Sequence, residues 1–134
     1  MPIIKKIGDH HMELGDDVAF VRFVGDETAS DAKEFISLMQ EAYGTNPYYV
    51  ILDSHHIGNV DPEARRIFSA WLADYGLRGA AIYGATVTTR TFVRLVDSLV
   101  RLFGRKVIPF VFVKTHQEAV LWVDEQRNKA RSQS

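Results

Sequence analysis

The strongest constraint on the fold of this chain is a change of pattern near residue 28. Beyond that point, short and continuous apolar segments alternate with longer segments whose apolar residues recur at helical spacing. The first pattern is typical of strands buried on both faces, and the second is typical of amphipathic helices. Strands that alternate with helices in this way are joined by right-handed crossovers into a parallel sheet. This part of the chain therefore predicts an α/β fold.

The segments before residue 28 indicate strands joined by tight turns. Residues 18–24 are rich in valine and phenylalanine, and Gly15 with two aspartates supplies the turn before them. The full prediction is a mixed sheet with an antiparallel N-terminal ribbon, parallel βα repeats and four helices. The predicted strands are 3–7, 11–14, 18–24, 48–52, 79–84 and 107–113, and the predicted helices are 28–43, 61–76, 88–103 and 116–128.

The chain length of 134 residues fits one domain. We expect residues 1–126 to form it and residues 127–134, whose one apolar member is Ala130, to be a disordered tail. Pro109 lies within the last predicted strand and cannot donate a ladder hydrogen bond. That strand is therefore expected at an edge of the sheet.

Composition excludes several classes of protein. With 16 basic and 17 acidic residues the net charge is -1, so no general attraction to nucleic acid follows. Cysteine is absent, which rules out disulfides, thiolate metal sites and cysteine nucleophiles. The longest apolar run, 107–113, is far shorter than the roughly 20 residues of a membrane span. No signal peptide is recognisable at the start, and we expect a cytoplasmic protein.

The segment 50–67 is the most informative part of the sequence. An apolar strand ends in Asp53, a predicted loop covers residues 54–60, and a helix begins at Asp61. The Asp61 carboxylate can cap that helix, Pro62 suits its first position, and Glu63 lies at the positive end of its dipole. In α/β proteins, a helix start after the carboxyl end of a strand is a common place for binding groups.

These residues resemble the motif of the STAS domain, the family of sulfate transporter and anti-sigma-factor antagonist domains. Leu52-Asp53 is similar to the strand end of that family, and Val60-Asp61 is similar to the apolar residue and capping aspartate of its next helix. The order of elements is also similar, from about Ile3 to Glu125. The resemblance implies a STAS-like α/β fold and a non-enzymatic domain that docks onto a protein partner in bacterial signalling.

The run from Asp61 to Arg65 looks like the branch similar to the sporulation anti-sigma-factor antagonist (SpoIIAA-like). In the phospho-regulated members of the family, a serine stands two positions after the capping aspartate, where this chain has Glu63. The resemblance therefore implies the docking surface without the phosphorylation switch. Two interpretations of Glu63 stay open: a permanent imitation of the charged state, or an ordinary acidic residue in a first helical turn.

The predicted docking surface is the loop after the strand together with the outer face of the next helix. The resemblance implies as partner an anti-sigma factor, a kinase or another signalling subunit, and self-association into a homodimer is a further expectation. No cofactor, metal or catalytic residue is expected. The partner-binding residues that we predict are Ser54, His55, His56, Asn59, Asp61, Glu63, Arg65 and Arg66.

Two alternatives start from other residues. Asp53, Thr86 and Lys114 each follow a predicted strand, as the phospho-acceptor groups of a receiver domain do, but the acidic pair after the first parallel strand is limited to Asp26 and Glu27. A carrier of an apolar small molecule or lipid is the other alternative. Fifteen aromatic residues and the broad apolar face of the third helix would line its pocket if that helix stands off the sheet.

Two histidine pairs, 10–11 and 55–56, are the candidate metal ligands. Adjacent residues on a strand point to opposite faces, so neither pair presents both imidazole rings to one ion. The simpler interpretation is that these histidines form hydrogen bonds or lie at the surface, and no metal site is predicted from them.

Overall fold

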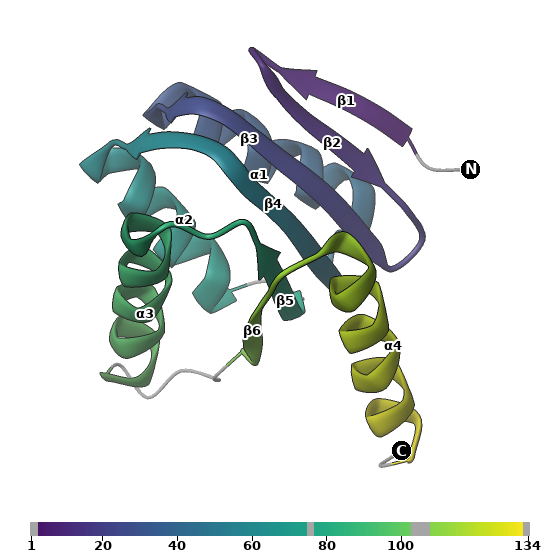
Figure 1. Cartoon of the computed structure of the whole chain (residues 1–134). Coiled ribbons are helices and arrows are strands. Elements are labelled where there is room, and N and C mark those ends of the chain that lie inside the picture. Colours follow the sequence, from purple (N-terminus) through teal and green to yellow (C-terminus); the bar gives the residue numbers. More distant parts are fainter. Residues whose placement is uncertain (1–2, 75–76, 103–107, 133–134) are drawn as a thin grey trace.

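The computed structural model describes residues 3–74, 77–102 and 108–132, in which six strands form one sheet and four helices cover it (Figure 1). The strands are β1 (Ile3–Ile7), β2 (His10–Leu14), β3 (Val18–Glu27), β4 (Tyr48–Val60), β5 (Leu77–Tyr83) and β6 (Phe110–Val113). The helices are α1 (Ala29–Tyr43), α2 (Pro62–Asp74), α3 (Val87–Leu102) and α4 (His116–Ser132).

The sheet is mixed, and its strands lie side by side in chain order from β1 to β6. β1, β2 and β3 pair antiparallel, whereas β3, β4, β5 and β6 pair parallel. This arrangement confirms the predicted ribbon and βα repeats. β6 is an edge strand, as Pro109 predicts, and the carbonyl of Pro109 accepts a hydrogen bond from the Ala80 N–H at 3.1 Å.

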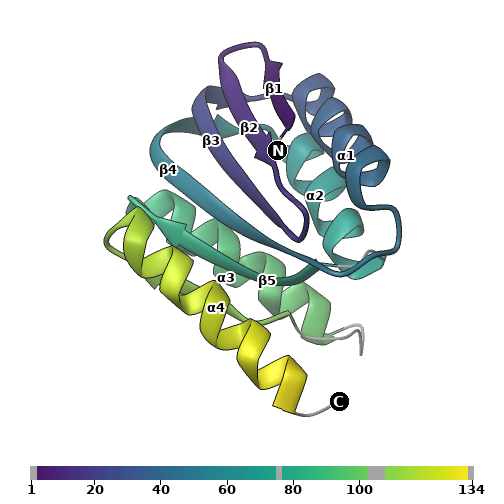
Figure 2. The same ribbon diagram turned by 90° about the vertical axis from the view of Figure 1, so that its right-hand side faces the viewer.

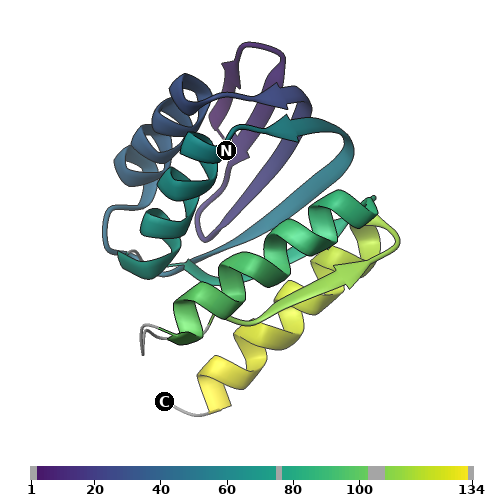
Figure 3. The ribbon, with the colours of Figure 1, turned by 90° about the vertical axis from the view of Figure 1, so that its left-hand side faces the viewer.

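The helices cover the two faces of the sheet unequally. α1, α2 and α3 lie on one face and α4 lies on the other (Figures 2 and 3). The larger core fills the space under α1 and α2, where the Phe35 ring lies 5.4 Å from Trp71 and 5.5 Å from Phe68. Ala119 and Val123 of α4 pack against Tyr49 and Ile51 on the opposite face. In the described residues, no helix combines the length and the hydrophobicity that a membrane crossing requires.

Helix α1 begins and ends where the local chemistry requires. The Thr28 hydroxyl accepts a hydrogen bond from the Asp31 N–H at 3.1 Å, which satisfies one of the free donors of the first turn. Gly44 ends the helix with a φ of 58°, a conformation that costs glycine little, and its N–H donates to the Gln40 carbonyl. The sequence offers Thr28 or Ser30 as the cap of this helix and Gly44 as its end, and the structure uses Thr28 and Gly44.

Strand β4 is much longer than predicted. Residues 54–60 were expected to form a loop, but the strand continues through them to Val60, paired with β3. From Arg22 to Glu27 β3 advances five residues, whereas β4 advances seven from Asp53 to Val60, so the ladder contains two register shifts. Shifts of this kind, in which one strand gains an extra residue, are typical of β-bulges, which bend a strand and raise its twist. The loop prediction is wrong because these bulges let a polar segment stay in the sheet, and Figure 1 shows the resulting curl of β3 and β4.

Helix α4 extends to Ser132, so the expectation of a disordered tail is wrong for residues 127–132. The guanidinium of Arg127 donates to both carboxylate oxygens of Asp17, at 2.8 and 2.5 Å, and to Asp124 at 2.7 Å. These contacts attach the end of the helix to the turn before β3. Residues 133–134 lie outside the described residues, as do the predicted helix ends at 76 and 103 and the predicted strand start at 107.

Replacing Arg127 with alanine is expected to loosen the end of α4. The pair is partly exposed, so we expect a loss of about 0.5–1 kcal/mol in the free energy of unfolding, measured by urea denaturation. Amide hydrogen exchange should become faster in residues 127–132. Lys129→Ala, an exposed change on the same helix, is the control. Equal exchange in Arg127→Ala and in the wild type would show that Asp17 does not hold the helix end.

Candidate functional site

Seven of the eight predicted partner-binding residues lie exposed where β4 ends and α2 begins. We call them the β4–α2 surface: His55, His56, Asn59, Asp61, Glu63, Arg65 and Arg66. Ser54 differs, because its side chain is fully buried and its hydroxyl donates to the Tyr83 carbonyl at 2.9 Å. Its place on a strand, rather than in a loop, explains the burial, and Ser54 cannot contact a partner directly.

Backbone contacts with β3 fix the β4 part of this surface. The Asn59 N–H donates to the Asp26 carboxylate at 2.9 Å, and the Asp61 N–H donates to the Glu27 carbonyl at 3.0 Å. Gly58 lies so close to Asp26 that a methyl group in its place would collide with it. The surface is therefore carried by a rigid strand end and not by a free loop.

The first turns of α2 present both signs of charge. Glu63 and Arg66 form an exposed ion pair with 3.4 Å between oxygen and nitrogen, a weak contact that a partner could replace. Arg65 is held differently, since its Nε donates to the Val60 carbonyl at 3.1 Å. The arrangement offers one carboxylate and two guanidinium groups within two helical turns.

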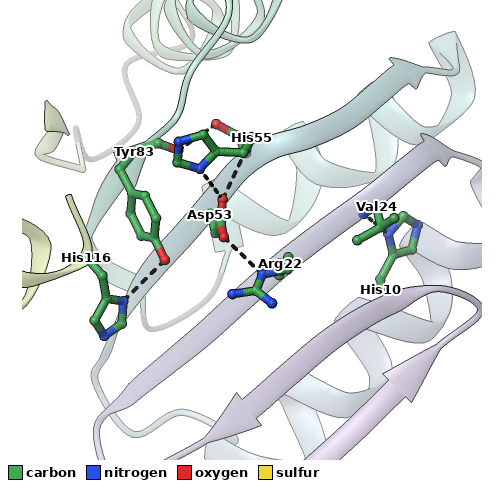
Figure 4. A network of polar contacts seen from close by, with 8 residues as sticks. His10, Arg22, Val24, Asp53, His55, Tyr83 and His116 are labelled. Carbon is green, nitrogen blue, oxygen red and sulfur yellow. Dashed lines mark hydrogen bonds and ion pairs between the residues drawn. The ribbon is translucent and has the colours of Figure 1, made fainter. Parts of the chain in front are cut away.

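Beside this surface, Asp53 is the centre of a compact polar network (Figure 4). Its carboxylate accepts from Arg22 Nε at 2.9 Å, and from the backbone N–H and the ring of His55 at 3.1 and 2.8 Å. Burial alone would raise the pKa of Asp53, but these hydrogen bonds outweigh it and hold the pKa below its usual value. Asp53 is therefore ionised, and its hydrogen bonds to Arg22 and His55 hold β3 and β4 together.

A second pair extends the network toward α4. The Tyr83 hydroxyl lies 3.3 Å from His116 Nδ1 at the start of α4, and the Tyr83 ring packs edge-on against both His116 and His55 (Figure 4). Gly84 lies against the His55 ring, and a methyl group there would overlap it. The network thus joins β3, β4, β5 and α4, and it fixes the orientation of His55.

The residues of the receiver interpretation do not serve a common phosphoryl site. Both oxygens of Asp53 are already bonded, as described above. The Thr86 hydroxyl accepts from the Thr89 N–H and caps α3, and the Lys114 N–H donates to Glu118. The parallel strands also follow chain order, whereas the doubly wound order of receivers places the first strand between the second and third. The geometry gives this alternative no support.

A buried group of His10, Glu27 and Asp31 is the one described cluster whose donor atoms could meet at a metal, since they lie within 4.8 Å of one another. The Val24 N–H donates to His10 Nδ1 at 2.9 Å, so the proton of the neutral ring is on Nε2 (Figure 4). That nitrogen faces Glu27 at 2.9 Å and Asp31 at 3.5 Å. Because a metal ligand needs a free lone pair there, the group does not fit a metal ion.

A cavity of about 430 Å³ lies between the sheet and helices α2 and α3. Its walls are mainly apolar, and the buried carboxyl of Glu27 is among its lining groups. This volume is within the range of small-molecule sites. Representative lining residues are Val21, Val50 and Ala80 of the strands and Phe68, Trp71 and Val93 of the helices.

In the sequence prediction Glu27 appears only in the acidic pair Asp26-Glu27, the candidate Mg²⁺ ligands of the receiver alternative. A signal for its position exists in the sequence. Alternate residues of a strand share a face, so the series Val21, Phe23 and then Glu27 places the carboxyl on the core side if the strand continues beyond Val24. The predicted strand ends at Val24, so the sequence prediction does not extend the alternation of faces to Glu27.

Comparison with solved structures reveals a similar fold. An uncharacterized protein from the DUF3478 family of Shewanella loihica PV-4, described as having a SpoIIAA-like fold, superposes with a TM-score of 0.56 over 91% of each chain. The sequence identity is 16%, so the similarity concerns the fold alone. The chain therefore has a SpoIIAA-like fold of the STAS type, as the resemblance at Leu52-Asp53 and Val60-Asp61 implies. No family model and no curated protein matches the sequence.

Replacing Asp53 with asparagine is expected to lower the free energy of unfolding by about 1–3 kcal/mol at pH 7, because charged hydrogen bonds to Arg22 and His55 are lost. The pKa of Asp53 is depressed in the folded state, so its contribution is present above the unfolded pKa and is lost as pH falls. The difference from the wild type should therefore shrink below about pH 4. Urea denaturation from pH 3 to 7 measures it, and a difference that stays constant would contradict this explanation.

Proposed function

We propose that this chain is a non-enzymatic regulatory domain of the STAS type, which binds a protein partner through the β4–α2 surface. The observation that supports this function is the exposure of seven polar side chains on a strand end and a helix start that are rigidly held. Exposed polar groups on a rigid frame can bind a partner without the loss of conformational entropy that ordering a loop would require.

Charge supports the same interpretation. Glu63 occupies the position at which the phospho-regulated relatives in the resemblance carry serine, and Arg65 and Arg66 lie beside it. Rim charges of this kind mainly govern the rate of association and the choice of partner. A partner with a complementary arrangement of charges, such as an anti-sigma factor, a kinase or another signalling subunit, is the expected ligand of the surface.

A non-enzymatic role agrees with the state of the polar groups next to the surface. The strongest candidate for chemistry, Asp53, has its oxygens bonded to Arg22 and His55 within the sheet. Ser54, the neighbouring hydroxyl, is buried and donates to a carbonyl, so it is not presented as a nucleophile. Both side chains are explained by the stability of the strand end.

Glu63→Lys is the sharpest test of the docking surface, since it reverses one exposed charge without touching the core. Tagged wild type and variant are used to capture proteins from the native host at two salt concentrations. We expect the variant to lose one specific partner. Glu125→Lys, the same change on exposed α4, should keep it. If both variants retain the same set of proteins as the wild type, the β4–α2 surface is not the binding site.

The cavity supports a second candidate function, a carrier of an apolar small molecule. The sequence predicts such a pocket under the third helix, and the 430 Å³ cavity lies between the sheet, α2 and α3. The two functions are compatible, because most of the β4–α2 surface faces outward and two of its residues, Asn59 and Arg65, also line the cavity.

Filling the cavity tests the carrier function. Ala80 is half-buried and lines the cavity, so Ala80→Leu should reduce its volume and the amount of apolar molecule that the purified protein retains. Organic extraction followed by mass spectrometry measures the bound molecule. Ala70→Leu, the same change at an exposed position of α2, is the control and should leave the bound amount unchanged. The carrier function fails if the wild type neither retains an apolar molecule nor takes up added 1-dodecanol.

A further inference from the structure

Glu27 is the least explained side chain in the described part of the molecule. It is 1% exposed, and neither of its carboxylate oxygens has a hydrogen-bond partner among the described residues. Oε2 lies 2.9 Å from His10 Nε2, so its polar neighbour is the histidine, whereas no such contact is found for Oε1 among the described residues. A buried polar group without a partner lowers stability, so its presence at the end of β3 requires a reason.

The neighbours of Glu27 do not supply a compensating cation. The Val24 N–H donates to His10 Nδ1, which leaves the His10 ring neutral with its proton on Nε2. The other neighbour is the Asp31 carboxylate of α1, which repels a second negative charge. Burial, together with Asp31, raises the pKa of Glu27 to about 8. At neutral pH the side chain is therefore an uncharged carboxyl, able both to donate and to accept a hydrogen bond.

The carboxyl of Glu27 lies at the wall of the cavity. Its side chain lines the cavity between the sheet and helices α2 and α3, whose other walls are mainly apolar. An apolar cavity with one polar group at its wall is the usual design of a small-molecule site, in which the polar group fixes the orientation of the ligand. An unpaired carboxyl in such a wall leaves a hydrogen bond for the occupant to complete.

We infer that Glu27 is the recognition point of the cavity, and that the ligand is an uncharged, elongated apolar molecule ending in a hydroxyl or carbonyl oxygen. This inference rests on the carrier function proposed above and adds the chemical class of the ligand. The oxygen of the ligand completes the hydrogen bond of the Glu27 carboxyl, and the apolar chain occupies the space beside Phe68 and Trp71.

Charged ligands fit this site less well. An ammonium group would have to leave water for a cavity in which Glu27 is the acidic wall group, at a high cost of desolvation. Arg65, which also lines the cavity, would repel it. A carboxylate could pair with Arg65, but the Asp31 carboxylate beside Glu27 would repel it. A neutral oxygen avoids both costs.

Calorimetric titration with 1-dodecanol and dodecylamine tests the inference on the wild type, Glu27→Leu and Glu27→Gln. We expect the wild type to prefer the alcohol, and Glu27→Leu to bind it about tenfold more weakly because one hydrogen bond is lost. Glu27→Gln keeps a donor and an acceptor, so its affinity should stay close to that of the wild type. Glu34→Gln, at an exposed position of α1, is the matched control and should bind like the wild type.

A stability measurement separates recognition from damage to the fold. Glu27→Leu removes an unpaired buried group, so its urea midpoint should be equal to or higher than that of the wild type, while its affinity for 1-dodecanol falls. Equal binding by Glu27→Leu and the wild type would overturn the role of Glu27 and leave the carrier function intact. A wild-type preference for dodecylamine would overturn the proposed ligand class. If the wild type binds neither probe, the carrier function itself fails.

Discussion

The parallel pairing of β3 with β4 is the interaction on which the other features depend. It sets Arg22 opposite Asp53 and Glu27 opposite Val60, so it places both the polar network and the buried carboxyl. The two bulges in this pairing lengthen β4 relative to β3 and carry its last residues beyond the neighbouring strand β5, which stops at Tyr83. The exposed strand end of the β4–α2 surface is a result of this difference in length.

The two buried carboxyl groups of β3 and β4, Glu27 and Asp53, have environments that shift their pKa values in opposite directions. Asp53 is surrounded by donors, and the hydrogen bonds from His55 and Arg22 lower its pKa. Glu27 lies on the other face of the sheet, beside a second carboxylate, and burial raises its pKa to about 8. The compensated group stabilises the sheet, whereas the uncompensated group is maintained at a cost to stability. Such a cost is typical of binding sites, which are rarely optimal for folding.

The sequence was sufficient for the order of elements, because alternating apolar strands and amphipathic helices and the stop at Gly44 are local signals. The SpoIIAA-like fold was expected from the resemblance at Leu52-Asp53 and Val60-Asp61. The sequence was not sufficient for the end of β4. Histidine, glycine and asparagine in residues 54–60 indicate a loop, and a bulged pairing that keeps them in a sheet depends on β3, 30 or so residues away. The cavity could be anticipated but not established, since its volume depends on how α3 packs against the sheet.

Glu27 connects the two candidate regions, which also share Asn59 and Arg65 as lining residues of the cavity. The side chain of Glu27 lines the cavity, and its backbone carbonyl accepts the hydrogen bond from the Asp61 N–H that fixes the start of α2. The cavity and the start of α2 are thus joined through the single residue Glu27. Energetic effects of substitutions in the two regions should therefore be non-additive, in contrast to sites that share no contacts. A substitution that moves Glu27 in the cavity is therefore expected to displace the start of α2 as well.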